Sequence, residues 1–324
     1  LNKKDISGNI LNKKDISGNI LNKKDISGNI LNKKDISGNI LNKKDISNIK
    51  KIIITGGGIN GIAILGAITE FLKYCDYKNI TDIVCVSVGS IIGILLIVGY
   101  TVDEIKNIFI EIQLNNFTDY KIKTFINEWG LDNGKKSKNL LRAMLKNKNI
   151  NHDITFKELY KYSNKKFIVV VTNLTLRKAE YFNHETTPNI KIVDAIRISC
   201  CYPVIFTPIK HNNCYYVDGG VLESYPIKYY KNKGDVLGFV IDYVDENDTK
   251  TIINTIDEYY LALLSTIITK YEYIKICKYK KNTVIINKKN ITTQSMNFKI
   301  TKENKYKLYN IGSKAFNDFK LIYI

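Results

Sequence analysis

Arginine is scarce in this chain. Of its 49 basic residues, only Arg142, Arg177 and Arg197 are arginine. Specific base readout in nucleic acids relies on the planar arginine fork, so we expect no nucleic-acid partner even though the formal net charge is +18. Lysine, asparagine, isoleucine and tyrosine are abundant instead, as in products of AT-rich genomes. The charge therefore indicates a solvated lysine-rich surface, with weak attraction to anionic lipid as a by-product.

Metal-binding and targeting patterns are missing from the sequence as well. The six cysteines form no CxxC pair, the three histidines are scattered without an HExxH motif, and no calcium-loop pattern occurs. Several cysteines lie in apolar runs, which predicts reduced, buried thiols. We expect no metal and no organic cofactor. No secretory signal is visible at the start, so the expected location is the cytoplasm, with peripheral attachment to membranes as a variant.

The first 47 residues are a tandem repeat. The unit LNKKDISGNI occurs four times, and a fifth copy fades into LNKKDISNIK. Its leucine and isoleucine positions fall on no single helical face, and each unit also contains glycine, asparagine, lysine and aspartate. The pattern predicts a disordered low-complexity tail over residues 1–47 rather than a solenoid. The remaining residues, 48–324, are long enough for one large domain or two small ones.

Buried strands and helices alternate along residues 48–324. The patterns predict strands at 51–55, 82–86, 166–172, 215–218, 236–242 and 283–286, and helices at 60–74, 90–99, 103–115, 138–146, 155–162, 192–199, 255–270 and 301–319. Such alternation is typical of an α/β fold with a mostly parallel central sheet and helices on both faces.

An uncharged run of eighteen residues, from Ile83 to Tyr100, reaches the minimum length of a membrane-spanning helix. It contains Ser87, Gly89, Ser90 and Gly93, with β-branched residues before Ser87 and helix-compatible residues after it. We interpret the run as a buried strand followed by a buried helix. A transmembrane segment is the alternative, and with it a membrane-associated protein without enzymatic activity.

A glycine-rich loop, Gly56–Gly61, separates the first strand from the first helix and satisfies GxGxxG. A dinucleotide site would also need an acid about 20 residues on, at the end of the second strand. The nearest acid, Asp82, stands at the start of that strand. A Rossmann-like nucleotide-binding protein is therefore an alternative based on the loop alone, and the competing reading is a loop that holds a transient oxyanion.

The second strand ends in Cys85-Val-Ser-Val-Gly89, a GxSxG nucleophile elbow with cysteine in its first position. Such a turn needs small neighbours, a need that Gly89 meets and Cys85 meets only in part. Ser87 is the candidate nucleophile, and a serine that merely caps a buried helix is the alternative.

A nucleophilic serine needs a base. The three histidines, His152, His184 and His211, do not follow the Ser-Asp-His order of an α/β-hydrolase. A better candidate is Asp218, because a short strand followed by Gly219 and Gly220 presents its carboxylate on a tight turn. An ordinary Asp-Gly turn is the alternative.

Together these motifs resemble the patatin-like phospholipase family, over nearly all of residues 51–319. Gly56–Gly61 resembles its oxyanion loop, Cys85–Gly89 its serine elbow and Asp218–Gly220 its DG[GA] motif. Between them, Ala195–Pro208 resembles the family segment Ala-x-x-Ala-Ser…Pro…Phe-x-Pro.

The resemblance implies a lipid acyl hydrolase with a Ser-Asp dyad. Ser87 would be the nucleophile and Asp218 the proton acceptor. The resemblance assigns the oxyanion hole to Gly56, Gly57, Gly58 and Gly61, and the elbow and DGG positions to Cys85, Gly89, Gly219 and Gly220. The implied substrate is a phospholipid or other glycerolipid at a membrane surface, cleaved without a metal. The chain departs from the family at Cys85 and at Asn60, where Arg or Lys is common, so a catalytically silent relative is the alternative.

Overall fold

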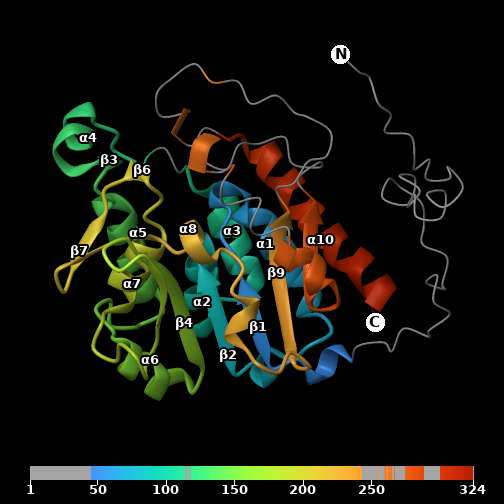
Figure 1. Cartoon of the computed structure of the whole chain (residues 1–324). Helices are drawn as coiled ribbons and strands as arrows, with labels where there is room; N and C mark the ends of the chain where they lie inside the picture. Colours follow the sequence, from blue (N-terminus) through green and yellow to red (C-terminus); the bar gives the residue numbers. More distant parts are fainter. Residues whose placement is uncertain are drawn as a thin grey trace, which may run out of the picture. The chain divides into compact units, whose positions relative to one another are not determined.

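The computed structural model describes residues 45–113, 116, 118–242, 253, 259–260, 262–264, 266, 274–287 and 300–323 (Figure 1). The repeat tail up to residue 44 lies outside the described residues, and so does most of the helix expected at 255–270.

A central sheet organises the described part of the chain. Its parallel portion has the order β10-β9-β1-β2-β4, and β5, β8 and β7 extend it in antiparallel orientation. The strands are β1 (Lys51–Ile54), β2 (Asp82–Val86), β4 (Lys166–Asn173), β5 (Lys178–Phe182), β7 (Ile209–His211), β8 (Cys214–Asp218), β9 (Val236–Asp242) and β10 (Thr283–Asn287). A separate parallel pair consists of β3 (Gly130–Asp132) and β6 (Val204–Phe206).

The helices are α1 (Gly61–Phe71), α2 (Val88–Ile97), α3 (Val102–Glu111), α4 (Ile122–Glu128), α5 (Lys135–Asn147), α6 (Phe156–Ser163), α7 (Ile192–Ser199), α8 (Gly220–Glu223) and α10 (Lys302–Tyr323). Short 3-10 turns are η1 (Ile46–Asn48), η2 (Gly58–Asn60), η3 (Tyr77–Asn79), η5 (Ile227–Tyr229) and η6 (Lys280–Asn282). Helix α6 begins where the sequence predicts, because Thr155 and Glu158 form a capping box. Thr101 and Glu104 do the same for α3.

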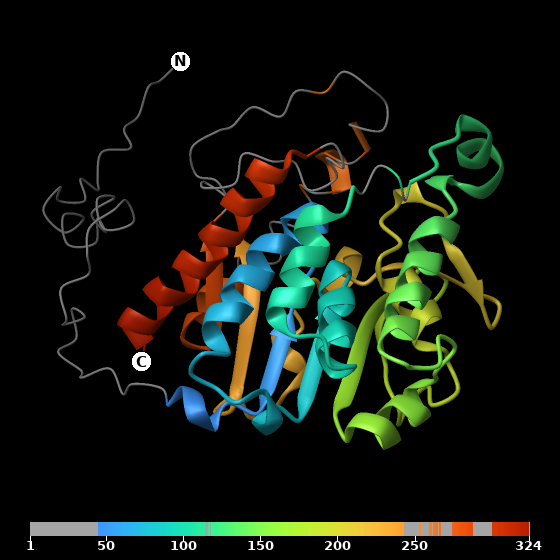
Figure 2. The same ribbon diagram turned by 180° about the vertical axis from the view of Figure 1, so that it is seen from behind.

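Alternate residues of each central strand enter two different cores. In β1, Ile52 and Ile54 join the larger cluster, whereas Ile53 joins the smaller one on the opposite face. Long helices, among them α1, α3 and α10, cover the first face (Figure 2). The second face is covered by the segment after β8, through Tyr225 and Ile227. The predicted mixed α/β fold with a mostly parallel sheet is confirmed, and its two faces are covered unequally.

Helices α1 and α10 pack at backbone contact distance. A Cβ added at Gly66 would lie 2.0 Å from the carbonyl oxygen of Tyr309, and one added at Gly312 would lie 1.7 Å from that of Ala63. The absence of side chains at the two glycines is therefore what allows α10 to lie against α1.

The uncharged run 83–100 is divided between β2 and α2, as the interpretation of its serines and glycines predicts. Within the described residues, no helix combines the length and the apolarity that a bilayer crossing requires. All six cysteines are free thiols. Burial is confirmed for Cys75, Cys85 and Cys201, but the expectation is wrong for Cys277, which is exposed.

Candidate active site

Ser87 connects β2 to α2 in a conformation that residues other than glycine rarely adopt. Its φ is 52° and its ψ is −130°, a geometry whose strain is on the order of 1–3 kcal/mol. Two neighbouring serines hold it. The Ser87 N–H donates to Ser199 Oγ at 2.9 Å, and the Ser87 carbonyl accepts from Ser90 Oγ at 2.5 Å. Strand, strained turn and helix form the structural context expected of a nucleophile elbow.

Glycines make room around this turn. A Cβ at Gly56 would lie 2.9 Å from Ser87 Cβ, and one at Gly89 would lie 2.3 Å from the carbonyl oxygen of Ile54. Cys85 replaces the usual first glycine of the elbow without a clash, because its Sγ faces Gly93 in the second turn of α2. A Cβ at Gly93 would lie 2.5 Å from that sulfur. The departure at Cys85 is thus accommodated by packing within the elbow.

Strand β4 brings the ends of two other strands together. Val170 pairs with Val86 at the end of β2, and the next residue, Val171, pairs with Asp218 at the end of β8. Because β5 occupies the other edge of β4, β2 and β8 share one edge and run toward each other. Their ends therefore meet, and Ser87 Oγ donates a hydrogen bond of 2.6 Å to Asp218 Oδ2.

The Asp218 carboxylate is held in a buried position, with 2% of the residue exposed. Its Oδ1 accepts the Gly220 N–H at 2.8 Å, and its own N–H donates to the Cys201 carbonyl at 2.9 Å. Burial raises the pKa of the Asp218 carboxyl to about 7, against the opposing effect of the hydrogen bonds from Ser87 and Gly220. Gly219 lets the turn pass β4 closely, since a Cβ there would lie 2.2 Å from the carbonyl oxygen of Val170.

The glycine loop follows β1 and passes beside the serine. Gly57 and Gly58 have positive φ values of 152° and 54°, which favour glycine. Gly61 begins α1 in contact with Val88 of the elbow, since a Cβ there would lie 2.6 Å from Val88 Cγ1. Asn60, at the position where the family commonly has a cation, is fully buried. Gly56 of the loop thus adjoins the Ser87 side chain, and the start of α1, where a helix dipole favours negative charge, adjoins Val88 of the elbow.

His184 and His211 lie away from Ser87. The His184 ring stacks on Tyr160 at 3.7 Å between centroids, next to the Glu185–Lys166 ion pair at the amino end of β4. His211 ends β7 and pairs with Cys214 at the start of β8. The hydroxyl of Ser87 thus donates to a carboxylate and not to an imidazole. Asp82 lies at the amino end of β2, whereas the glycine loop follows the carboxyl end of β1. Asp82 is therefore not at the position where a dinucleotide site would need an acid.

Ser199 is the site residue that the motifs did not assign. Its Oγ accepts the Ser87 N–H and donates to the carbonyl oxygen of Val170 at 2.7 Å, so it ties the elbow to β4. Its position in the segment 195–208, which resembles a family segment, was the available signal. The sequence pattern alone does not reveal that Ser199 accepts a hydrogen bond from Ser87, which lies 112 positions earlier in the chain.

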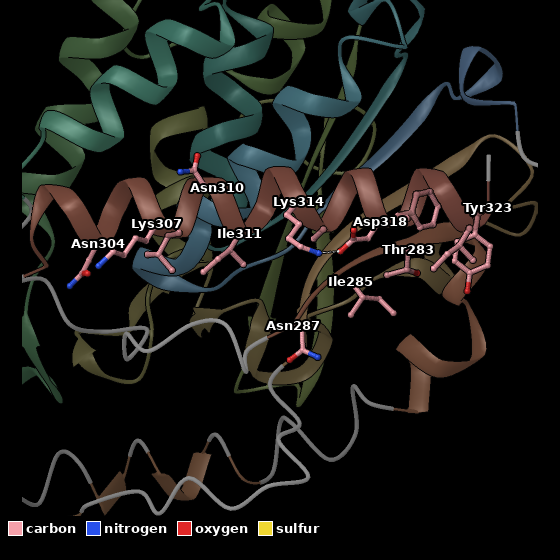
Figure 3. A pocket seen from close by; sticks show the side chains of 14 residues that line it. Thr283, Ile285, Asn287, Asn304, Lys307, Asn310, Ile311, Lys314, Asp318 and Tyr323 are labelled. Carbon is pink, nitrogen blue, oxygen red and sulfur yellow. Dashed lines mark hydrogen bonds and ion pairs between the residues drawn. The ribbon is translucent and has the colours of Figure 1, made fainter. Parts of the chain in front are cut away.

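A hollow of about 850 Å³ lies away from this site, between β10 and α10 (Figure 3). Its walls include Ile285 and Ile311, and a Lys314–Asp318 ion pair spans part of its rim at 2.7 Å. Neither Ser87 nor Asp218 lines it. Within the described residues, no group of three histidine, cysteine or acidic side chains is arranged to hold a metal ion.

Comparisons with known proteins agree with these motifs. The family model for patatin, described as patatin-like phospholipase, matches residues 52–230. An uncharacterized protein of Acanthamoeba polyphaga mimivirus is 32% identical over 281 residues, 83% of this chain and 93% of that protein. "Probable lipid hydrolase 463L" of Invertebrate iridescent virus 6 is 35% identical over 194 residues, 57% of this chain and 65% of that protein.

The fold also matches a solved structure. The crystal structure of VipD from Legionella pneumophila aligns with a TM-score of 0.58 at 16% identity, covering 90% of this chain and 69% of that one. An α/β protein with a serine elbow facing a buried aspartate is the class that fold and site define. The chain belongs to the patatin-like phospholipase family.

Proposed function

We propose that this chain hydrolyses fatty-acyl esters of phospholipids or other glycerolipids through a serine-aspartate dyad. The observation that carries the proposal is the 2.6 Å hydrogen bond from Ser87 Oγ to the buried Asp218 carboxylate. Family membership and a relative whose name is "Probable lipid hydrolase 463L" support the choice of a lipid ester as substrate. The catalytic domain would span residues 48–324 and act on lipid at a membrane surface facing the cytoplasm, with the tail 1–47 outside it.

In the first half-reaction, Asp218 Oδ2 takes the proton of the Ser87 hydroxyl as Oγ attacks the ester carbonyl carbon. The carbonyl oxygen becomes an oxyanion, which the amides of Gly57 and Gly58 stabilise. One such donor is typically worth about a hundredfold or more in rate. The intermediate then collapses, the bond to the alcohol oxygen breaks, and Asp218 returns its proton to the leaving alkoxide. The products are a free alcohol, such as a lysolipid, and an acyl-enzyme on Ser87.

In the second half-reaction, Asp218 takes a proton from water, whose oxygen attacks the acyl carbonyl. The second oxyanion forms in the same loop, and its collapse releases the fatty acid and restores the Ser87 hydroxyl with the proton from Asp218. A base works best when its pKa lies near the operating pH. Burial raises the pKa of Asp218 to about 7, which suits it to both steps where an ordinary surface aspartate would be a weaker base.

Labelling by a fluorophosphonate probe tests the assignment directly. The probe forms a phosphorus–oxygen bond to an activated serine and releases fluoride. We expect the wild type and the matched control Ser47→Ala to be labelled and to release fatty acid from phosphatidylcholine. Ser87→Ala would do neither, and Asp218→Asn would react at least about a hundredfold more slowly, the typical worth of a general base.

Two results would contradict the proposal. One is full ester hydrolysis by Ser87→Ala, which would move the nucleophile elsewhere. The other is a folded wild type that neither reacts with the probe nor cleaves any ester, which would make the chain a catalytically silent relative.

A further inference from the structure

Helix α4 exposes an apolar face that the described fold leaves uncovered. Its residues Ile122, Phe125 and Ile126 recur at helical spacing, yet none of the seven residues of α4 is buried. Ile122 is 76% exposed and Ile126 is 69% exposed. Apolar faces of surface helices normally point into a core, so this one is built for contact with something outside the described fold.

Trp129 terminates α4 in an unusual way. It occupies the C-cap with a φ of 64°, in the left-handed region that normally suits glycine or asparagine. A bulky residue in this conformation is an outlier whose strain is worth about 1–3 kcal/mol. It is also the only tryptophan of the chain, and it is 59% exposed. The turn therefore displays an indole to solvent at the expense of local backbone stability.

Further apolar side chains continue this surface toward the dyad. The Trp129 ring lies 5.4 Å from the ring of Tyr215 in β8, and the Tyr215 carbonyl accepts the N–H of Leu174 in the β4–β5 turn. We call the exposed members the α4 patch: Tyr120, Ile122, Ile126, Trp129, Leu174 and Leu176. Tyr215 precedes Asp218 by three residues, an advance of about 10 Å along a strand. Both views show α4 beyond the end of the sheet where β2 ends (Figures 1 and 2).

Lysines surround the patch. Lys121 and Lys123 are exposed on α4 and beside it, Lys136 donates to the Thr118 carbonyl next to it, and Lys210 lies 5.7 Å from the centre of the Tyr215 ring. Two exposed acids lie among these lysines: Asp119 is paired with Lys121 at 2.8 Å, and Glu128 is the last residue of α4. An apolar and aromatic surface ringed by lysine matches the chemistry of an anionic bilayer interface, where indole rings settle at headgroup depth and lysines meet phosphate and carboxylate groups.

We propose that the α4 patch docks the protein on anionic phospholipid membranes and so brings the Ser87–Asp218 site to the lipid surface. The inference rests on the proposed function for its purpose, because a lipid hydrolase must reach substrate in a bilayer. The docking itself requires no catalysis, which allows it to be tested apart from hydrolysis.

Vesicle co-sedimentation of the full chain carrying Ser87→Ala tests the docking. We expect binding to phosphatidylcholine vesicles that contain 30% phosphatidylserine, a composition we specify for the assay. Adding Ile122→Ser and Ile126→Ser would weaken the partition of the protein onto these vesicles at least about tenfold, since burial of one isoleucine side chain in the membrane is worth about a tenfold change in affinity. The matched control replaces Ile274 and Leu321, which are 66% and 79% exposed and do not belong to the patch, by serine, and we expect it to leave vesicle binding unchanged.

Charge is tested separately. Lys123→Gln with Lys210→Gln would lower binding to the phosphatidylserine vesicles about tenfold or more and reduce its dependence on salt, because each lysine near such a surface contributes a factor of about five. Binding to vesicles of phosphatidylcholine alone would change little. Circular dichroism of each variant confirms that it is folded.

Hydrolysis by variants that carry the same substitutions but retain Ser87 gives a second readout. The ratio of vesicle hydrolysis to hydrolysis of a soluble short-chain ester should fall at least about tenfold for the Ile122→Ser, Ile126→Ser variant. Equal losses on both substrates, or vesicle binding as tight as that of the control, would overturn the docking proposal. So would loss of self-association in sedimentation velocity without loss of vesicle binding, which would assign the patch to a second copy. If no ester is cleaved but the patch-dependent vesicle binding stands, only the proposed function fails.

Discussion

Replacing the buried carboxylate by its neutral isostere should make the protein more stable at neutral pH while it removes activity. Asp218→Asn keeps the shape, and its amide still accepts from Gly220 through oxygen and donates to Ser87 through nitrogen. The wild-type pKa rises from 3.8 to about 7 on folding. Between these pH values the native state binds more protons than the unfolded state, so wild-type stability falls as pH rises.

The magnitude follows from the shift. A change of about three pKa units at 1.36 kcal/mol each sets a ceiling of about 4 kcal/mol, and we expect about 2–4 kcal/mol of added stability for Asp218→Asn at pH 8. The gain should shrink as the pH falls toward 4 and approach zero below the unfolded-state pKa of 3.8, where the wild-type carboxyl becomes protonated in both states. Other titrating groups are shared by the two proteins and cancel in the difference.

Urea unfolding of both proteins at several pH values measures this difference. The same group should appear in catalysis, as a rise of kcat/KM through about pH 7 as Asp218 loses its proton. A variant that is less stable than wild type at pH 8, or a stability difference that does not vary between pH 4 and 8, would refute the reasoning. Either result would mean that burial does not destabilise the ionised Asp218 carboxylate.

Two further substitutions probe the frame around the site. Ser199→Ala removes the hydroxyl that accepts the Ser87 N–H, so we expect kcat to fall about tenfold or more with little change in KM. Ser199→Thr should restore much of the lost kcat. An unchanged kcat in Ser199→Ala would rule out a positioning role for this residue. Gly312→Ala places a Cβ against the Ala63 carbonyl and should lower the free energy of unfolding by more than about 2 kcal/mol. In the control Gly234→Ala the nearest atom to the added Cβ is a side-chain oxygen at 3.4 Å, so the free energy of unfolding measured with denaturant should stay within about 1 kcal/mol of wild type. Equal losses of stability in the two variants would count against the α1–α10 contact.

Strands and helices with a strong period were predictable from the sequence. The predicted limits of β2, α7 and β9 match the structure, because each is a run whose apolar pattern has one interpretation. In the antiparallel extension, β8 was predicted at 215–218, but β5 and β7 were missed. Strand β5 carries Lys178 and Glu180 and lies at the sheet edge, where little apolar alternation is required. Helix α4 was missed for a related reason, since its apolar residues face no core.

The individual motifs of the site could be predicted from the sequence, but the strand pairing that brings them together could not. Ser87, Asp218 and the glycines stood out as motifs, because each needs an unusual backbone. The register that aligns Val170 with Val86 and Val171 with Asp218 left no trace in the sequence, since residues 167–171 of that strand are uniformly apolar. The partnership of Ser199 with Ser87 depends on the same register.

The meeting of β2 and β8 along one edge of β4 has a consequence for synthesis of the chain. The proposed nucleophile leaves the ribosome early, but its base belongs to a strand that is translated 131 residues later. A nascent chain that ends just before β8 would already contain Ser199 but would lack the proton acceptor Asp218, so its Ser87 would be unactivated. Acyl transfer would thus begin only after the antiparallel part of the sheet has closed, which would delay the onset of hydrolysis until folding of the site is complete.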